Sequence, residues 1–122
     1  DFSYCDSGMI PWLLVVSVLS ETGQSLSSLV EEMIKKFPCS GEINFKVADT
    51  QITIQKLFDY FADQNPTIDK TDGVSLDFGA WRFNVRASNT EPLLRLNIES
   101  RLDQHPKPMQ EYVDELTRLI QN

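Results

Sequence analysis

The sequence predicts an α+β fold: a four-stranded antiparallel sheet with two helices on one face, in the order β-α-β-β-β-α, preceded by two further helices. Apolar and polar residues alternate in segments 43–47, 74–78, 81–85 and 94–98, as in strands with one buried face. Apolar residues recur at helical spacing in 54–61 and 109–120. The last three strands are joined by short connections, which favours an antiparallel meander with both helices packed on one side.

The first forty residues read as two helices without a strand of their own. Residues 10–19 are apolar almost all round, so this helix needs cover on most sides. Trp12, Leu13 and Val16 are therefore expected to be exposed, folded back, or covered by a second copy of the chain. Residues 21–24 form a turn, and 26–37 have the spacing of an amphipathic helix.

Residues 38–41, with Pro38 and Gly41, break the helical pattern and mark the expected boundary between a domain at 1–40 and a domain at 41–122. In the second domain, Asp49 or Thr50 can cap the helix that follows the first strand. Residues 63–72 are polar and are expected to form a loop.

The segment 86–92, R-A-S-N-T-E-P, connects two of the expected strands. Arg86 offers a planar fork of donors, Ser88 and Thr90 offer hydroxyls, and Asn89 offers an amide, all within five residues. This inventory suits a tetrahedral oxyanion, and free backbone N–H groups of the turn can add to it. The alternative is a hairpin turn whose polar side chains satisfy only their own backbone.

The motif R-x-S-x-T-E-P, placed between two strands near the C-terminus, resembles the phosphate-binding loop of the α-D-phosphohexomutases, the family of bacterial phosphomannomutase/phosphoglucomutase. Segments 41–45, 72–78 and 81–86 are similar to the last domain of that family, and segment 4–11 resembles the end of the preceding domain. The expected fold of 41–122 is then TATA-box-binding-protein-like. Residues 1–40 would be the C-terminal helices of the preceding α/β domain.

The resemblance implies a role for the loop. Arg86 would make the charge-assisted contact to the substrate phosphate, and Ser88, Asn89 and Thr90 would donate further hydrogen bonds. The intact enzyme would interconvert mannose 6-phosphate and mannose 1-phosphate through a bisphosphorylated intermediate, with phosphoglucomutase activity as the alternative. The partners are then a hexose phosphate and the remaining domains of the same enzyme.

Residues near the motif are assigned supporting roles. Glu91, Pro92 and Arg95 are expected to brace the loop rather than to bind the ligand. Arg82 is expected to pair across strands with Glu99, Asp77 or a similar carboxylate. Asp69, Asp72 and Asp77 look like turn and strand-edge carboxylates, and His105 lies in a polar linker without a metal-ligating neighbour.

By the same resemblance, the phosphoserine, the Mg²⁺ site and the sugar-recognition loop lie on earlier domains and match no position here. No catalytic residue, metal ligand or cofactor is therefore expected in this chain, Mg²⁺ belongs to the full-length enzyme, and the chain alone is expected to be inactive. Because it opens without Met, we expect a segment of a longer protein.

Composition and charge disfavour several other classes of protein and of binding partner. A net charge of −7 disfavours nucleic acid and anionic membranes as partners. The apolar run 9–19 is shorter than the roughly 20 residues that cross a bilayer. Cys5 and Cys39 form no C-x-x-C motif, and two reduced thiols in a cytoplasmic protein are expected, with a single disulfide bridge as the alternative. A stand-alone phosphate-binding module and a protein-interaction module remain as alternatives, and phosphate binding separates the two.

Overall fold

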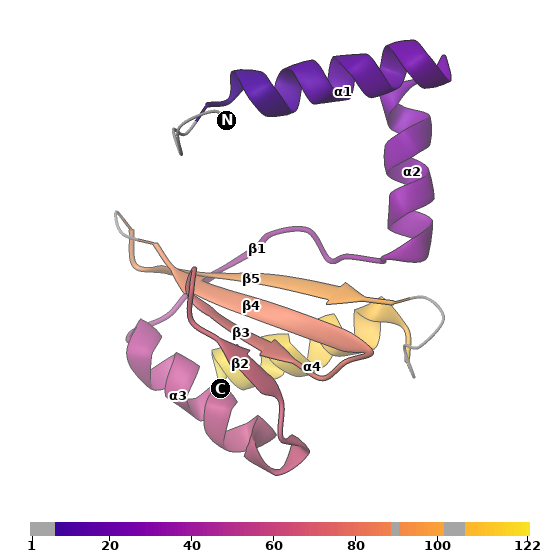
Figure 1. The fold of residues 1–122 in the computed structure, drawn as a ribbon. Coiled ribbons are helices and arrows are strands. Elements are labelled where there is room, and N and C mark those ends of the chain that lie inside the picture. The colour runs from indigo at the N-terminus through magenta and orange to yellow at the C-terminus, as the bar shows by residue number, and fades with distance from the viewer. Residues whose placement is uncertain (1–6, 89–90, 102–106) are drawn as a thin grey trace. The chain divides into compact units, whose positions relative to one another are not determined.

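The computed structural model describes residues 7–88, 91–101 and 107–122. The chain divides into two compact units, Asp1–Met33 and Ile34–Asn122. Figure 1 shows the helices at the N-terminal end of the chain and the sheet with its two helices in the remainder. Each unit is described by itself below.

The first unit contains α1 (Met9–Thr22) and most of α2 (Leu26–Lys36). Neither helix has a buried residue. On α1, the exposed fraction is 57% for Trp12 and 54% for Leu13. Trp12 and Leu13 are therefore left uncovered by the chain itself, and cover by a second copy stays a prediction.

No single helix in the described part of the chain is long and apolar enough to span a membrane. Only α1 and α2 taken together pass on length and composition, and the pair is bent by 98° at the break between them.

The second unit is built on a five-stranded sheet with strand order β1-β5-β4-β3-β2. The strands are β1 (Ile43–Lys46), β2 (Thr67–Asp69), β3 (Val74–Asp77), β4 (Trp81–Ala87) and β5 (Leu93–Ser100). All neighbours pair antiparallel, which confirms the α+β class. The fifth strand, β2, lies in the stretch 63–72 that was expected to be loop. It is three residues long and all three are exposed, so it leaves no burial pattern in the sequence.

Two helices, α3 (Thr50–Phe61) and α4 (Met109–Gln121), cover one face of the sheet (Figure 1). A short 3₁₀ turn (Ala62–Gln64) follows α3. The Asp49 carboxylate accepts hydrogen bonds from the backbone N–H groups of Gln51 and Ile52, so Asp49 is the N-cap of α3. The buried apolar side chains between sheet and helices form one core: Phe45, Ile54, Leu57, Phe61, Leu76, Trp81, Phe83, Val85, Leu94, Leu96, Ile98, Tyr112, Leu116 and Ile120.

The segment that connects the two expected domains is hydrogen-bonded to β5. The Ser100 N–H donates to the Pro38 carbonyl at 2.9 Å, and the Ser40 N–H donates to the Ile98 carbonyl at 2.9 Å. The Ser40 hydroxyl in turn accepts from the Ile98 N–H, also at 2.9 Å. Residues 38–40 therefore belong to the sheet rather than forming a free connection.

The turn before β3 is packed directly on β4. Gly73 has φ +71°, and a Cβ atom placed there would lie 2.5 Å from the Val85 carbonyl oxygen. The Asn84 side-chain amide donates to the Asp72 carbonyl at 2.8 Å and to the Ser75 hydroxyl at 3.0 Å. A left-handed glycine and one amide thus fix the position of Asp72 relative to β4.

We expect Gly73→Ala to lower the free energy of unfolding by more than Gly79→Ala does. Both residues have positive φ, which costs about 1–2 kcal/mol for a side chain with a Cβ. A Cβ at Gly79 meets no atom within 4 Å, whereas a Cβ at Gly73 meets backbone. The clash should add about 1–3 kcal/mol at Gly73, measured by urea unfolding of the two variants. Equal losses for the two variants would show that the turn relaxes away from β4.

Candidate functional site

A pocket of about 610 Å³ lies at the end of the sheet where β4 leads toward β5. Its walls come from four segments: the first turns of α3, the turn before β3, the end of β4 and the start of β5. The lining residues are Gln51, Ile54, Asp72, Gly73, Val74, Arg86, Ala87, Ser88 and Arg95. Four of them were singled out in the sequence: Arg86 and Ser88 as phosphate ligands, Arg95 as a supporting residue and Asp72 as a turn carboxylate. The structure brings these four together here.

Arg86 is the penultimate residue of β4 and points to the sheet face opposite the core, because its neighbour Val85 is fully buried. The guanidinium Nη1 donates to the Asp72 carboxylate at 3.0 Å. Both side chains are substantially exposed, 42% for Arg86 and 74% for Asp72. An ion pair this exposed contributes at most about 1 kcal/mol, so an anionic ligand can displace the carboxylate at little cost.

Ser88 directly follows β4, and its backbone N–H donates to the Leu93 carbonyl at 2.8 Å. This bond continues the pairing of β4 with β5 by one step beyond the named strands. Glu91 and Pro92 are exposed, and the Leu93 N–H donates to the Glu91 carbonyl at 2.7 Å. Asn89 and Thr90, the other two expected phosphate ligands, lie outside the described residues.

Arg95 lies on β5 directly opposite Arg86. Its Nη1 is 3.9 Å from the Glu42 carboxylate, too far for a hydrogen bond. Its Nε atom is buried and has no hydrogen-bond partner among the described residues. Leaving a buried donor without a partner costs about 1–3 kcal/mol.

The turn that holds Asp72 is ordered by a second carboxylate. Asp69 accepts hydrogen bonds from the Thr71 hydroxyl at 2.6 Å and from the Thr71 backbone N–H at 2.8 Å. These two bonds hold the pKa of Asp69 below its ordinary value. Asp69 and Asp77 act as turn carboxylates, as expected, since Asp77 accepts from the Gly79 N–H at 2.7 Å. Asp72 differs, because its side chain is directed to Arg86.

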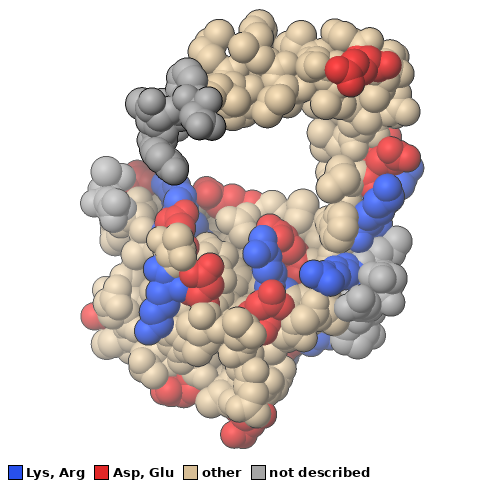
Figure 2. Space-filling model, viewed as in Figure 1, with Lys and Arg blue, Asp and Glu red and all other residues tan. Residues whose placement is uncertain are grey.

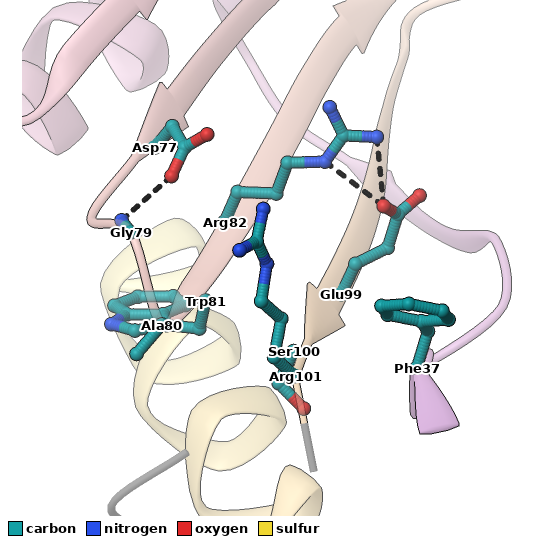
Figure 3. A pocket seen from close by; sticks show the side chains of 9 residues that line it. All are labelled: Phe37, Asp77, Gly79, Ala80, Trp81, Arg82, Glu99, Ser100 and Arg101. Carbon is teal, nitrogen blue, oxygen red and sulfur yellow. Dashed lines mark hydrogen bonds and ion pairs between the residues drawn. The ribbon is translucent and has the colours of Figure 1, made fainter. Parts of the chain in front are cut away.

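A second, smaller pocket of about 260 Å³ lies at the other end of β4 and β5 (Figure 3). Its main polar contact is the Arg82–Glu99 ion pair, with Nε and Nη2 of Arg82 at 2.9 and 2.7 Å from one carboxylate oxygen. The structure thereby confirms the expected cross-strand pairing of Arg82. In Figure 2, acidic and basic side chains are mixed over the face in view, so that face has no large patch of one charge.

Sequence reasoning missed the parts of the larger pocket that come from distant segments. Gln51 and Ile54 belong to the first turns of α3, and Asp72, Gly73 and Val74 belong to the turn and start of β3. The one signal was the Asp-Gly pair at 72–73, which indicates a turn but does not say which strand the turn contacts.

Within the described ranges, no group of three or more His, Cys, Asp and Glu side chains could hold a metal ion. The larger pocket is lined by the guanidiniums of Arg86 and Arg95 and by one carboxylate, that of Asp72, so the positive charges outnumber the negative one and an anion is attracted. The arrangement is therefore suited to binding an anionic group.

Two family profiles match the chain. The profile described as the C-terminal domain of phosphoglucomutase/phosphomannomutase matches residues 42–116, and the profile described as alpha/beta/alpha domain III of the same enzymes matches residues 1–37. The first match includes all the described residues that line the larger pocket.

Curated relatives agree with these profiles. The chain is 58% identical over 103 residues to a protein named phosphohexose mutases from Xanthomonas campestris, covering 84% of the chain and 23% of the relative. It is 50% identical over 121 residues to a phosphomannomutase from Vibrio cholerae, covering 98% and 26%. It is 38% identical over 120 residues to a phosphomannomutase from Methanocaldococcus jannaschii, covering 98% and 25%.

The chain thus spans about a quarter of the length of the relatives it matches. The fold, the loop motif and the profile match over residues 42–116 all agree, and the chain belongs to the phosphoglucomutase/phosphomannomutase family of α-D-phosphohexomutases.

Proposed function

We propose that this chain supplies the phosphate-binding domain of a phosphomannomutase, which converts mannose 6-phosphate to mannose 1-phosphate and back through a bisphosphorylated intermediate. The observation that carries the proposal is the juxtaposition of Arg86 and Ser88, from the loop motif, at one pocket with Arg95. The names of several relatives favour mannose over glucose as the sugar. No described residue at the pocket is assigned to sugar recognition.

The proposed division of roles follows the loop motif. Arg86 makes the charge-assisted contact to the phosphate, and Ser88, Asn89 and Thr90 donate further hydrogen bonds. Charge-assisted bonds of this kind contribute about 1.5–3 kcal/mol each. Glu91 and Pro92 shape the loop between the strands. No step of bond making or breaking is assigned to these residues.

A phosphate-binding site of this kind suits a mutase because the sugar must react at two different oxygens. A site that recognises only the phosphate that is not reacting serves both orientations of the substrate. The binding energy gained at that remote phosphate can position the reacting end and exclude water from it. Arg86 and Ser88 would do this while the rest of the enzyme carries out the transfer.

The remaining parts of the proposal concern the whole protein. Residues 1–40 are assigned to the end of the preceding domain and residues 41–122 to the phosphate-binding domain, with the remaining domains of the enzyme as partners. Magnesium, which the resemblance implies for the whole enzyme, is assigned to none of the residues described here. The chain alone is expected to be inactive as a mutase, and its cytoplasmic location stays a prediction.

Substituting Arg86→Ala in the full-length protein should raise the KM for mannose 6-phosphate by about 10- to 150-fold and lower kcat, because a charge-assisted bond to the phosphate is lost. Arg82→Ala is the matched control, because Arg82 lies on the same strand and face but is paired with Glu99. Steady-state kinetics of both variants test this. Unchanged kinetics in Arg86→Ala would exclude the pocket as the phosphate site.

Substituting Asp72→Asn should lower the KM for mannose 6-phosphate by up to about fivefold. In the structure the Asp72 carboxylate is hydrogen-bonded to the Arg86 guanidinium. Removing its charge removes an internal competitor for the phosphate, and that competitor is worth at most about 1 kcal/mol. The control is Glu99→Gln, which neutralises the partner of Arg82 instead. A higher KM in Asp72→Asn would show that Asp72 orients Arg86 for the phosphate rather than competing with it.

A further inference from the structure

The turn between β2 and β3 is held in place on both sides of Asp72. Before it, the Asp69 carboxylate accepts hydrogen bonds from the hydroxyl and the backbone N–H of Thr71. After it, the left-handed Gly73 packs so closely on β4 that a Cβ atom there would lie 2.5 Å from the Val85 carbonyl oxygen. The side chain of Asp72 is 74% exposed, so these local restraints, rather than burial, fix its position.

Asn84 adds a third restraint from the middle of β4. Its side-chain Nδ2 donates to the Asp72 carbonyl at 2.8 Å and to the Ser75 hydroxyl at 3.0 Å, so the amide holds the turn on both sides of Gly73. A backbone carbonyl can only accept a hydrogen bond, which means that residue 84 must supply a donor here. Asn84 itself is not a lining residue of the larger pocket.

The restrained turn places a carboxylate beside Arg86. Side chains two residues apart on a strand lie on the same face, about 6.8 Å from each other. Asn84 thus holds the backbone of Asp72, while Nη1 of Arg86 donates to the carboxylate of the same residue at 3.0 Å. Because the backbone is already fixed, the carboxylate loses little conformational entropy by staying at the guanidinium.

An ion pair this exposed contributes little to stability, although three restraints hold its carboxylate in place. Its clearer effect is on a ligand, since a carboxylate and a phosphate compete for the same guanidinium hydrogens. Competition of this kind weakens binding, and among closely related complexes weaker binding mostly means faster dissociation. A mutase of the proposed kind needs such dissociation, because the sugar must present two different oxygens for reaction.

We propose that Asn84 is a positioning residue, which holds the Asp72 carboxylate against Arg86 as an internal competitor and so limits how tightly the pocket retains a phosphate. This inference rests on the proposed function of the pocket and adds a means by which its affinity is set. Asn84 acts through the turn, without touching the ligand, whereas Asp72 competes with the ligand directly.

The test is steady-state kinetics of the full-length protein with mannose 6-phosphate. Asn84→Ala removes both donors and should lower the KM by up to about fivefold, as expected for Asp72→Asn. The double variant should show no further decrease, because both substitutions remove the same competitor. The kcat should not rise in any of these variants, since none of them speeds release of the phosphate.

Asn97→Ala is the matched control. Asn97 lies directly opposite Asn84 on β5, and its side-chain amide makes no hydrogen bond to any described residue. The substitution is therefore the same in kind and place but leaves the turn attached to β4. It should leave the KM for mannose 6-phosphate unchanged.

A purely structural role of Asn84 would lower the midpoint of thermal unfolding without moving the KM. An unchanged or raised KM in Asn84→Ala would therefore overturn the proposal, and so would decreases in the two single variants that add up in the double variant. Asn84→Val removes the same donors and suits a strand, so it allows the same measurement if Asn84→Ala does not fold.

Arg86→Ala distinguishes this inference from the proposed function. If Arg86→Ala raises the KM and Asn84→Ala leaves it unchanged, the role of Asn84 is refuted while the function of the pocket stands. If Arg86→Ala also leaves the KM unchanged, the pocket is not the phosphate site and both are refuted.

Discussion

The pairing of β4 with β5 is the constraint on which the rest of the second unit depends. Its register runs from Trp81 opposite Ser100 to Ala87 opposite Leu94. Because side chains alternate between the two faces of a strand, this one register places Phe83, Val85, Leu96 and Ile98 against the helices. A slip by one residue would expose these side chains and bury the arginines. The buried side chains therefore fix the register of β4 and β5, and this register sets the positions of the arginines on the opposite face of the sheet.

The fold was largely predictable because its strands have one buried face. Strand β4 alternates almost perfectly between core and surface, and the amphipathic helices α3 and α4 follow from their spacing. Strand β2 was not predictable, since its three residues are all exposed. It forms only because β3 offers an edge with unpaired backbone groups, a property of the assembled sheet and of no local pattern.

Only the part of the candidate site that comes from one continuous segment was predictable from the sequence. The motif located Arg86 and Ser88, because one loop contributes both. The carboxylate that pairs with Arg86 comes from Asp72, which is brought close by the left-handed Gly73 and by the Asn84 amide. Likewise, the register that opposes the two arginines depends on the length of the turn between β4 and β5. These contacts between distant segments are set by long-range packing, so local sequence propensities do not predict them.

The hydrogen bonds of residues 38–40 to β5 have a mechanical consequence. Ser100 and Ile98, where this segment is attached, lie on the same strand as Arg95, about 17 and 10 Å further along it. If the domain turns about a pivot ahead of Pro38, β5 acts as a lever arm with the pocket near its far end. A rotation of about 10° then displaces Arg95 by about 3 Å, roughly the length of one hydrogen bond. A small turn is therefore enough to move the pocket by the length of a hydrogen bond.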